Sequence, residues 1–299
     1  MVQLQKQNAY LHALKPYLYE DALVKIINGL PAAPFLKDTP GLKANAYYFG
    51  QPKWAEGWLK FVHRSPLLRE RWHATAGSWN GKVVVDVGCG PGNLQANLND
   101  KPSLLIGVDV SAGTLHYAAK LGYVPLMADA HKMPLRSRIA DVVALNATIH
   151  HCDDMEAVIA EAARLVKPGG VFIADHDPQV SAYDFHGIGK FLWNLRMTVY
   201  RLAKRGGHRP EDSEQEWAAA TEIHHQPGDG LTETMFRKIL EPMGFAVNLY
   251  PHNHQVGREI LRGKMGKAPF KMRTAQLLSG IRPGTQSAAL SLLCVARKK

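Results

Sequence analysis

The segment from residue 83 to residue 100, VVVDVGCGPGNLQANLND, constrains the fold of this chain more than any other. Three consecutive valines open it, and such a β-branched run favours a strand that is buried on both faces, as in a parallel sheet covered by helices. A glycine-rich turn and then a helix-forming stretch follow directly. The sequence therefore predicts a strand–turn–helix unit of an α/β protein, with a ligand site where the strand ends.

The spacing of the glycines in this turn argues against a bound pyrophosphate. Gly88, Gly90 and Gly92 stand two residues apart, whereas a dinucleotide-binding turn has the spacing G-x-G-x-x-G. Pro91 also removes a backbone N–H from the place where a phosphate needs donors. A nucleoside without phosphate fits this turn better. Asp109, at the end of the next apolar run, supplies a carboxylate that can accept hydrogen bonds from both ribose hydroxyls.

Four motifs in this part of the chain resemble the class I S-adenosylmethionine-dependent methyltransferases. The glycine turn looks like motif I of that family, and three later segments match the family in order and spacing within residues 82–175. They are MADA around Asp129, NATIHH at 146–151 and LVKPGGVFIAD at 165–175. The similarity is greatest to the group that acts on quinones and other small natural products. The resemblance implies S-adenosyl-L-methionine as the cofactor.

The resemblance also implies a Rossmann-like, doubly wound α/β sheet of seven strands with the last strand antiparallel. From Lys82 onward, apolar strands alternate with helical stretches, as right-handed βαβ units require. Residues 1–80 are too apolar for a disordered tail, and we expect them to form a helical cap on a methyltransferase domain at 81–299. Insertions at 178–230 and 251–287 exceed the minimal fold, and we interpret them as walls of the acceptor pocket.

The cofactor-binding residues follow from the matched motifs. By resemblance, Asp109 binds the ribose and Asp129 accepts from the adenine amino group. Most aromatic residues before the first sheet strand are expected in the core, although Tyr47 or Tyr48 is a candidate to close over the cofactor or to stack on the acceptor. The full set expected to bind S-adenosyl-L-methionine is Asp86, Gly88, Gly90, Gly92, Asn93, Asp109, Val110, Asp129, Ala130, Asn146 and Ala147.

The candidate catalytic residues follow the fourth and fifth strands of the predicted sheet, at the edge where open α/β sheets bind ligands. His150 and His151 come first, and imidazole titrates near neutrality, which suits a general base. Similar methyltransferases place a histidine here, but the match does not say which of the two acts, and one of them can be a packing residue. Asp175, His176 and Asp177 form a second polar cluster, which is a candidate to orient this base or to bind the acceptor.

No metal is expected from the sequence. His224, His225, His252 and His254 fall within the two insertions, without the close ligand spacing of a metal motif. The three cysteines are too few and too scattered for a zinc module or a disulfide framework, which agrees with a reducing compartment. A metal-dependent O-methyltransferase is therefore a minor alternative.

The net charge of +10 is concentrated in the C-terminal part of the chain. Residues 187–299 contain 18 Lys and Arg against 9 Asp and Glu, whereas residues 1–186 contain 18 against 17. Within 258–273, six cations accompany one acid. Such a run can bind RNA, an anionic membrane surface or an acidic substrate. It can equally be a solvent-exposed helix face that keeps the protein soluble. Against RNA, the chain has no N-P-P-Y-like sequence after the fourth strand and no OB-fold or KH signature.

The sequence thus predicts methyl transfer from S-adenosyl-L-methionine to a small, partly hydrophobic metabolite, with oxygen as the expected acceptor atom. An RNA methyltransferase and a non-catalytic S-adenosylmethionine-binding protein are the alternatives, because acids and glycines argue for binding and not for turnover. The chain has neither a run of 18 apolar residues nor the apolar core of a signal peptide, so we expect no membrane span and a cytoplasmic location. A homodimer is compatible with the sequence.

Overall fold

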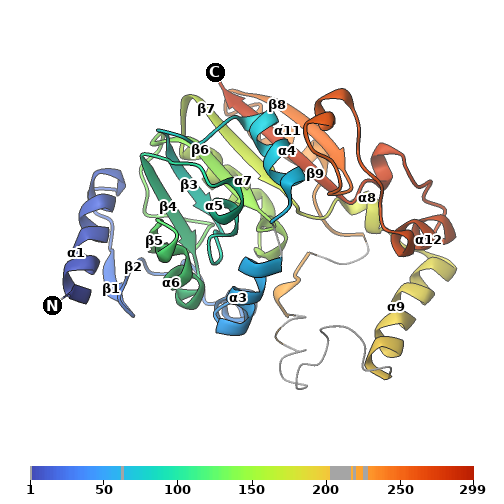
Figure 1. Cartoon of the computed structure of the whole chain (residues 1–299), viewed down its shortest axis with the longest axis horizontal. Coiled ribbons are helices and arrows are strands. Elements are labelled where there is room, and N and C mark those ends of the chain that lie inside the picture. The colour runs from blue at the N-terminus through green and yellow to red at the C-terminus, as the bar shows by residue number, and fades with distance from the viewer. Residues whose placement is uncertain (1, 62–63, 203–216, 218–219, 225–227) are drawn as a thin grey trace.

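A single nine-stranded sheet forms the centre of the molecule in the computed structural model, which describes residues 2–61, 64–202, 217, 220–224 and 228–299 (Figure 1). The strand order is β1-β2-β5-β4-β3-β6-β7-β9-β8. The strands are β1 (Lys25–Ile27), β2 (Leu30–Ala32), β3 (Val83–Val87), β4 (Leu104–Asp109), β5 (Val124–Met127), β6 (Ala140–Asn146), β7 (Val166–Asp175), β8 (Phe245–His252) and β9 (Ser291–Lys298).

The central strands confirm the predicted doubly wound topology. β3 pairs in parallel with β4 on one side and with β6 on the other, so the chain reverses its direction of winding at β3. β9 runs antiparallel to both of its neighbours, β7 and β8, as expected for the last strand. Ligands bind at such a reversal point, beyond the carboxyl ends of the strands. The residues that follow β3, β4 and β6 therefore surround the expected site.

The N-terminal segment departs from the purely helical cap that the sequence suggested. β1 and β2 form an antiparallel hairpin, and Ala32 of β2 pairs with Met127 of β5, so the sheet has nine strands and not seven. Asn28 and Gly29 connect the two strands, both with positive φ. Asn-Gly is the preferred pair for such a two-residue turn. The Asn-Gly dipeptide was the one sequence signal for this hairpin. Strands of three residues are too short to show an alternating pattern of apolar and polar residues.

Helices cover both faces of the sheet because alternate residues of the buried strands point to opposite sides. Val85 packs with side chains of α7 and α11, whereas Val84 packs with those of α4, α5 and α6. The α-helices are α1 (Val2–Leu14), α2 (Pro40–Tyr48), α3 (Pro52–Phe61), α4 (Pro66–Ala76), α5 (Asn93–Leu98), α6 (Ala112–Lys120), α7 (Met155–Arg164), α8 (Val180–Tyr183), α9 (Gly187–Leu202), α11 (Glu233–Leu240) and α12 (Phe270–Leu278). The 3-10 helices are η1 (Lys15–Tyr17), η2 (Ile149–His151), η3 (Arg258–Arg262) and η4 (Gln286–Ala288).

Side-chain caps begin three of these helices. Asp154 accepts a hydrogen bond from the Ala157 N–H and caps α7. Thr39 and Thr232 cap α2 and α11 in the same way. α6 begins directly after Ser111, but the Ser111 hydroxyl donates to the backbone oxygen of Ala46 and makes no capping bond. This contact ties α2 to the start of α6.

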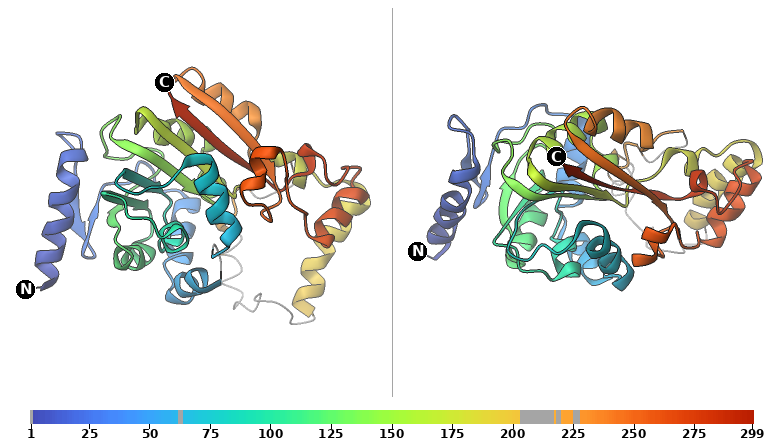
Figure 2. Two further views of the ribbon diagram at one scale, coloured as in Figure 1. Left: turned by 45° about the horizontal axis from the view of Figure 1, so that its top comes forward. Right: turned by 90° about the horizontal axis from the view of Figure 1, so that it is seen from above.

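The two insertions meet at one end of the molecule. α9, from the first insertion, packs against α12, from the second, around a small core that includes Phe185 and Met272. Figure 2 shows this pair at the opposite end from α1 and the β1–β2 hairpin. Part of the first insertion, residues 203–216, 218–219 and 225–227, lies outside the described residues. Among the residues that the structure describes, no helix has the length and apolar character to cross a membrane.

Candidate active site

The glycine turn after β3 fits tightly against the segment that follows β6. Gly88 has a φ of +67°, and a Cβ at this position would collide with the side chain of Thr148. Gly90 and Gly92 also have positive φ, at +52° and +90°. All three positions favour glycine because of their positive φ, and Gly88 is also required because Thr148 leaves no room for a Cβ. Without Cβ atoms here, a nucleoside can approach the backbone of the turn closely.

Asp109 is held at the edge of this turn in a defined orientation. Its Oδ2 accepts from the Gly90 N–H at 2.9 Å and its Oδ1 accepts from the Ser111 N–H at 2.8 Å. Burial raises the pKa of Asp109, and these backbone N–H groups partly oppose the shift. The side chain is only half-buried, and each oxygen has a further lone pair. The donor set of a ribose, two hydroxyls, fits this carboxylate.

Asp129 lies one strand further along, after β5. Its Oδ1 accepts from both the backbone N–H and the ring Nδ1 of His131, at 2.9 and 2.6 Å. Burial opposes ionisation of Asp129, but the hydrogen bonds from His131 hold its pKa below the usual value. An ionised acceptor is what the expected bond from an adenine amino group requires. Val110 and Ala130, which follow the two acids, are half-buried at the same edge of the sheet.

Asp86 and Asn93 flank the glycine turn, at the end of β3 and at the start of α5. Asp86 is buried, and its Oδ2 accepts from the Tyr123 hydroxyl at 2.6 Å. Burial raises the pKa of Asp86 to about 7, although the Tyr123 bond opposes the shift. Asn93 begins α5, and its Oδ1 is buried without a hydrogen-bond partner in the described part of the chain. A buried acceptor without a partner is uncommon in native structures.

The two candidate bases lie against each other in η2, after β6, with their rings tilted by 39°. The rings of His150 and His151 have centroids 3.9 Å apart. His150 is buried, and its Nδ1 lies 2.7 Å from Oδ1 of Asp177. The Nδ1 of His151 lies 2.7 Å from the backbone oxygen of Thr221, and Phe49 at the end of α2 contacts the ring with its edge. A carbonyl can only accept, so His151 carries its proton on Nδ1 and leaves Nε2 as the acceptor nitrogen.

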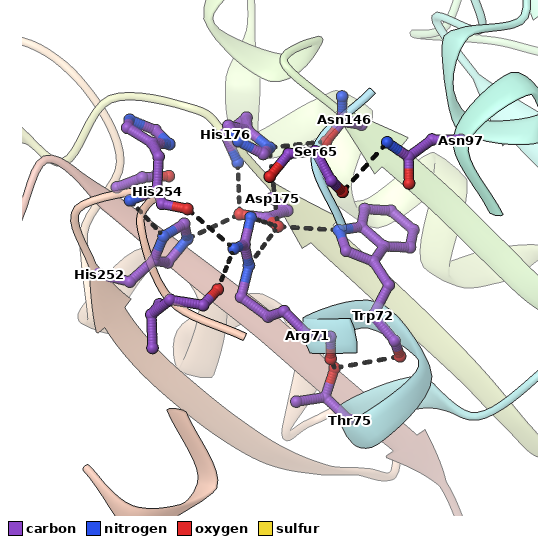
Figure 3. Close-up of polar contacts among 12 residues, drawn as sticks. Ser65, Arg71, Trp72, Thr75, Asn97, Asn146, Asp175, His176, His252 and His254 are labelled. Atoms are coloured by element: carbon purple, nitrogen blue, oxygen red, sulfur yellow. Dashed lines mark hydrogen bonds and ion pairs between the residues drawn. The ribbon is translucent and has the colours of Figure 1, made fainter. Parts of the chain in front are cut away.

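Asp175 occupies a different environment from the one that we expected (Figure 3). It is fully buried, and its Oδ2 accepts from Arg71 Nε and Nη2 at 3.1 and 3.0 Å and from Trp72 Nε1 at 2.8 Å. Its Oδ1 accepts from His252 Nε2 and from the His176 N–H, both at 2.7 Å. Burial disfavours the charge, but Arg71 holds the pKa of Asp175 well below its usual range. Five protein donors therefore share the two carboxylate oxygens, and a role for Asp175 in orienting the base or binding the acceptor stays a prediction.

His176 and Asn146 form a pair at the ends of β7 and β6. The Nδ1 of His176 lies 2.9 Å from Oδ1 of Asn146, and its ring stacks on His254 with the centroids 4.7 Å apart. His176 and Ala147 both adopt positive φ, at +65° and +52°. Such conformations are uncommon for residues with a side chain and cluster at functional sites. The pair lies where the paired strands β6 and β7 end, and the roles expected of Asn146, Ala147 and His176 stay predictions.

Asp177, from the polar cluster that the sequence indicated, contacts His150, but several other polar groups of this region were not predicted. Thr221 and Glu222 meet the histidines of η2, and Arg71 meets Asp175. Their partners lie far away in the sequence, so no local motif indicates the contacts. Tyr47, a candidate lid residue, contacts Trp217 of the first insertion with ring centroids 4.8 Å apart. The aromatic run before the first core strand was the only sequence signal for that contact.

Comparisons with known proteins agree with this architecture. Residues 85–174 match a family model described as a methyltransferase domain. The chain is 30% identical over 162 residues to a ubiquinone biosynthesis O-methyltransferase of Stutzerimonas stutzeri (strain A1501), covering 51% of this chain and 67% of the relative. It is also 30% identical over 95 residues to a malonyl-[acyl-carrier protein] O-methyltransferase of Yersinia pestis. That match covers 31% of this chain and 36% of the length of the relative.

The structural comparison supports the fold alone. The crystal structure of a geranyl diphosphate C-methyltransferase from Streptomyces coelicolor A3(2) superimposes with a TM-score of 0.53. The alignment covers 88% of this chain and 99% of that chain at 11% sequence identity. A shared fold at this identity leaves the acceptor open.

Proposed function

Because this chain belongs to the class I S-adenosylmethionine-dependent methyltransferases, we propose that it methylates a small, partly hydrophobic metabolite at a hydroxyl oxygen. The observation that carries the proposal is the histidine pair after β6. It follows a strand adjacent to β3, and the turn after β3 packs against Thr148, two residues before His150. An acceptor next to the histidines would therefore lie beside a cofactor held over the glycine turn.

The chain's own residues divide the work of such a reaction. We assign the ribose to Asp109, the adenine to Asp129 and the close backbone approach to Gly88, Gly90 and Gly92. When bound, S-adenosyl-L-methionine supplies a methyl group that is already electrophilic. The protein then has to align the acceptor and exclude water, and orientation of this kind can lower a barrier by roughly 7–11 kcal/mol.

The acceptor proton is assigned to His151. Its Nδ1 donates to the Thr221 carbonyl, so Nε2 has the lone pair that a general base needs. General-base assistance contributes about 10²–10⁴-fold in rate. His150, held by Asp177, positions the neighbouring ring. Oxygen as the acceptor atom is also supported by the relatives reported above, whose names describe O-methyltransferases.

The cofactor part of the proposal is tested by calorimetry on Asp109→Ala. We expect a loss of at least about tenfold in affinity for S-adenosyl-L-methionine, or about 1.4 kcal/mol. The matched control is Asp141→Ala, because Asp141 also accepts from a backbone N–H, that of Val83, but at the opposite end of the strands. Unchanged affinity in Asp109→Ala, with wild-type melting behaviour, contradicts the assignment.

The acceptor part is tested by product analysis. Purified protein is incubated with S-adenosyl-L-methionine and, separately, with phenols and hydroquinones, with small amines, and with total RNA. Methylated phenol or hydroquinone, made more slowly by His151→Ala, supports the proposal. Methylation of RNA alone identifies the RNA alternative, for which the cations of 258–273 were the motive. Cofactor binding without any methylated product identifies a non-catalytic binding protein.

A further inference from the structure

The histidine pair lies against a carboxylate from a distant part of the chain. One ring nitrogen each of His150 and His151 and one carboxylate oxygen of Glu222 lie within 4.8 Å of one another. The His150 Nε2 and the Glu222 Oε2 are 3.7 Å apart. A zinc ion with bonds of about 2.1 Å in tetrahedral geometry holds its ligand atoms about 3.4 Å apart. Small side-chain rotations would therefore bring the three atoms to coordinating distance.

Both histidines are already oriented through the other ring nitrogen. The Nδ1 of His150 contacts the Asp177 carboxylate, and the Nδ1 of His151 contacts the Thr221 carbonyl, each at 2.7 Å. Histidines that bind metals almost always donate their second ring N–H to a carboxylate or a backbone carbonyl, which fixes the tautomer and the ring. Coordination of a cation through Nε2 would keep both contacts, which are the outer partners that a metal site needs.

Glu222 is brought to the histidines by its neighbours and not by its own side chain. The Thr221 carbonyl on one side of it binds His151, and the backbone N–H of His224 on the other side donates to the His150 oxygen at 3.1 Å. Ile223 packs over Gly41 in α2, where a Cβ would lie 2.5 Å from its Cδ1. The backbone around Glu222 is thus fixed to η2, and its half-exposed carboxylate can still turn toward a cation.

We propose that His150, His151 and Glu222 form a binding site for one divalent first-row transition metal ion. Two imidazole nitrogens and one carboxylate oxygen are ligands that suit zinc, cobalt, nickel and ferrous iron. Magnesium prefers an all-oxygen shell and is not the expected occupant. Three protein ligands leave open positions, as in catalytic metal sites.

A cation at this site would also activate the acceptor, an inference that rests on the proposed function. A cation at the histidine pair would favour the ionised form of an acceptor hydroxyl, whose proton leaves to solvent. The oxygen–carbon bond then forms as the carbon–sulfur bond of the cofactor breaks. Activation by the metal would replace proton uptake by His151. An acceptor with two neighbouring oxygens, which can fill two open positions, is the favoured class.

Metal binding is measured directly on tag-free, chelator-treated protein. We expect one equivalent of Zn²⁺ by calorimetry and one equivalent of Co²⁺ by its visible absorption bands, with no competition from Mg²⁺. His151→Ala and Glu222→Gln should each weaken binding at least tenfold. Asp177→Asn, which removes an outer carboxylate, should weaken it about 10–100-fold. The control is His186→Ala, because His186 is an exposed histidine next to Asp184, outside this site.

The outcomes separate this inference from the proposed function. Absence of stoichiometric Zn²⁺ and Co²⁺ uptake, or uptake that survives both His151→Ala and Glu222→Gln, overturns the metal site. Melting curves and S-adenosyl-L-methionine binding show that the variants are folded. Methyl transfer that persists in chelator and still depends on His151 overturns the activation of the acceptor by the metal and keeps the general base. Stoichiometric metal without any methyl transfer supports the site and removes the proposed acceptor reaction.

Discussion

At the scale of single residues, Asp86 shows how burial raises the pKa of a carboxyl next to the glycine turn. Burial raises its pKa to about 7, partly opposed by the Tyr123 hydroxyl and reinforced by Asp109. In the unfolded chain this carboxyl has the ordinary aspartate pKa of 3.8. As the pH rises from about 4 to 7, the unfolded state loses its proton before the folded state does. The free energy of unfolding therefore falls over this range and is not affected further above pH 7.

Asp86→Asn should remove this loss, because the amide oxygen still accepts from Tyr123 and does not ionise. Relative to the wild type, the variant should gain about 1.4 kcal/mol in unfolding free energy per pH unit up to pH 7. Urea unfolding at pH 5, 6, 7 and 8 measures the difference. The control, Asp141→Asn, should instead lose the same amount of stability at all four pH values, since burial of Asp141 is outweighed by Lys167, its pKa is lowered, and its carboxylate is ionised in both states above pH 5. A constant difference for Asp86→Asn across these pH values contradicts the prediction.

The residue scale also separates what the sequence could reveal from what it could not. The glycine turn and Asp109 were predictable because strand, turn and acid are close together in the chain and follow one motif. The Arg71–Asp175 pair joins residues 104 positions apart, and the His150–Glu222 contact is equally non-local. No periodicity or spacing reports such contacts. Side chains after a strand can be assigned to the ligand edge from sequence, but their partners are decided by packing.

At the scale of elements, the α2–α3 connection docks on the first turn of α6, which begins three residues after Asp109. Gly113 in the first turn of α6 lies so close to Gly50 that a Cβ would collide with the Gly50 backbone. The Ser111 hydroxyl donates to the Ala46 oxygen at 3.0 Å next to this contact. Backbone atoms cannot rotate away, so the two segments depend on a glycine where they meet. The sequence predicted helices here but not this contact, since the fold alone brings residue 50 to residue 113.

Gly113→Ala should therefore weaken the docking of α2 and α3 although alanine is the better helix former. Overpacking of this kind typically destabilises by about 1–3 kcal/mol. We expect at least about a fivefold loss in S-adenosyl-L-methionine affinity and faster proteolysis within residues 40–61. Gly57→Ala in α3 is the matched control, because a Cβ there meets nothing within 4 Å. It should leave affinity unchanged. Equal affinity in both variants would show that α2 and α3 do not close the site.

At the scale of the whole molecule, the buried Asp175 network joins segments from three parts of the chain. Arg71 belongs to α4, Asp175 ends β7, and His252 ends β8. Arg71 Nη1 also donates to the backbone oxygens of His254 and Val256, at 3.3 and 2.7 Å. The N-terminal segment and the second insertion are thus held to the sheet through one side chain. Both insertions were expected as pocket walls, and this network gives the second one a fixed position.

Arg71→Met should destabilise the whole fold by about 3–5 kcal/mol, because it leaves the Asp175 carboxylate buried without its cation. The double variant Arg71→Met/Asp175→Asn removes both charges, so part of the loss should return. Urea unfolding at pH 7 measures all three proteins. At lower pH, the Arg71→Met penalty should shrink, since the wild-type pair is stable above the unfolded pKa of Asp175 and loses stability as the pH falls toward its depressed folded value. A double variant less stable than Arg71→Met would mean that hydrogen bonding by Asp175, and not its charge, fixes the network.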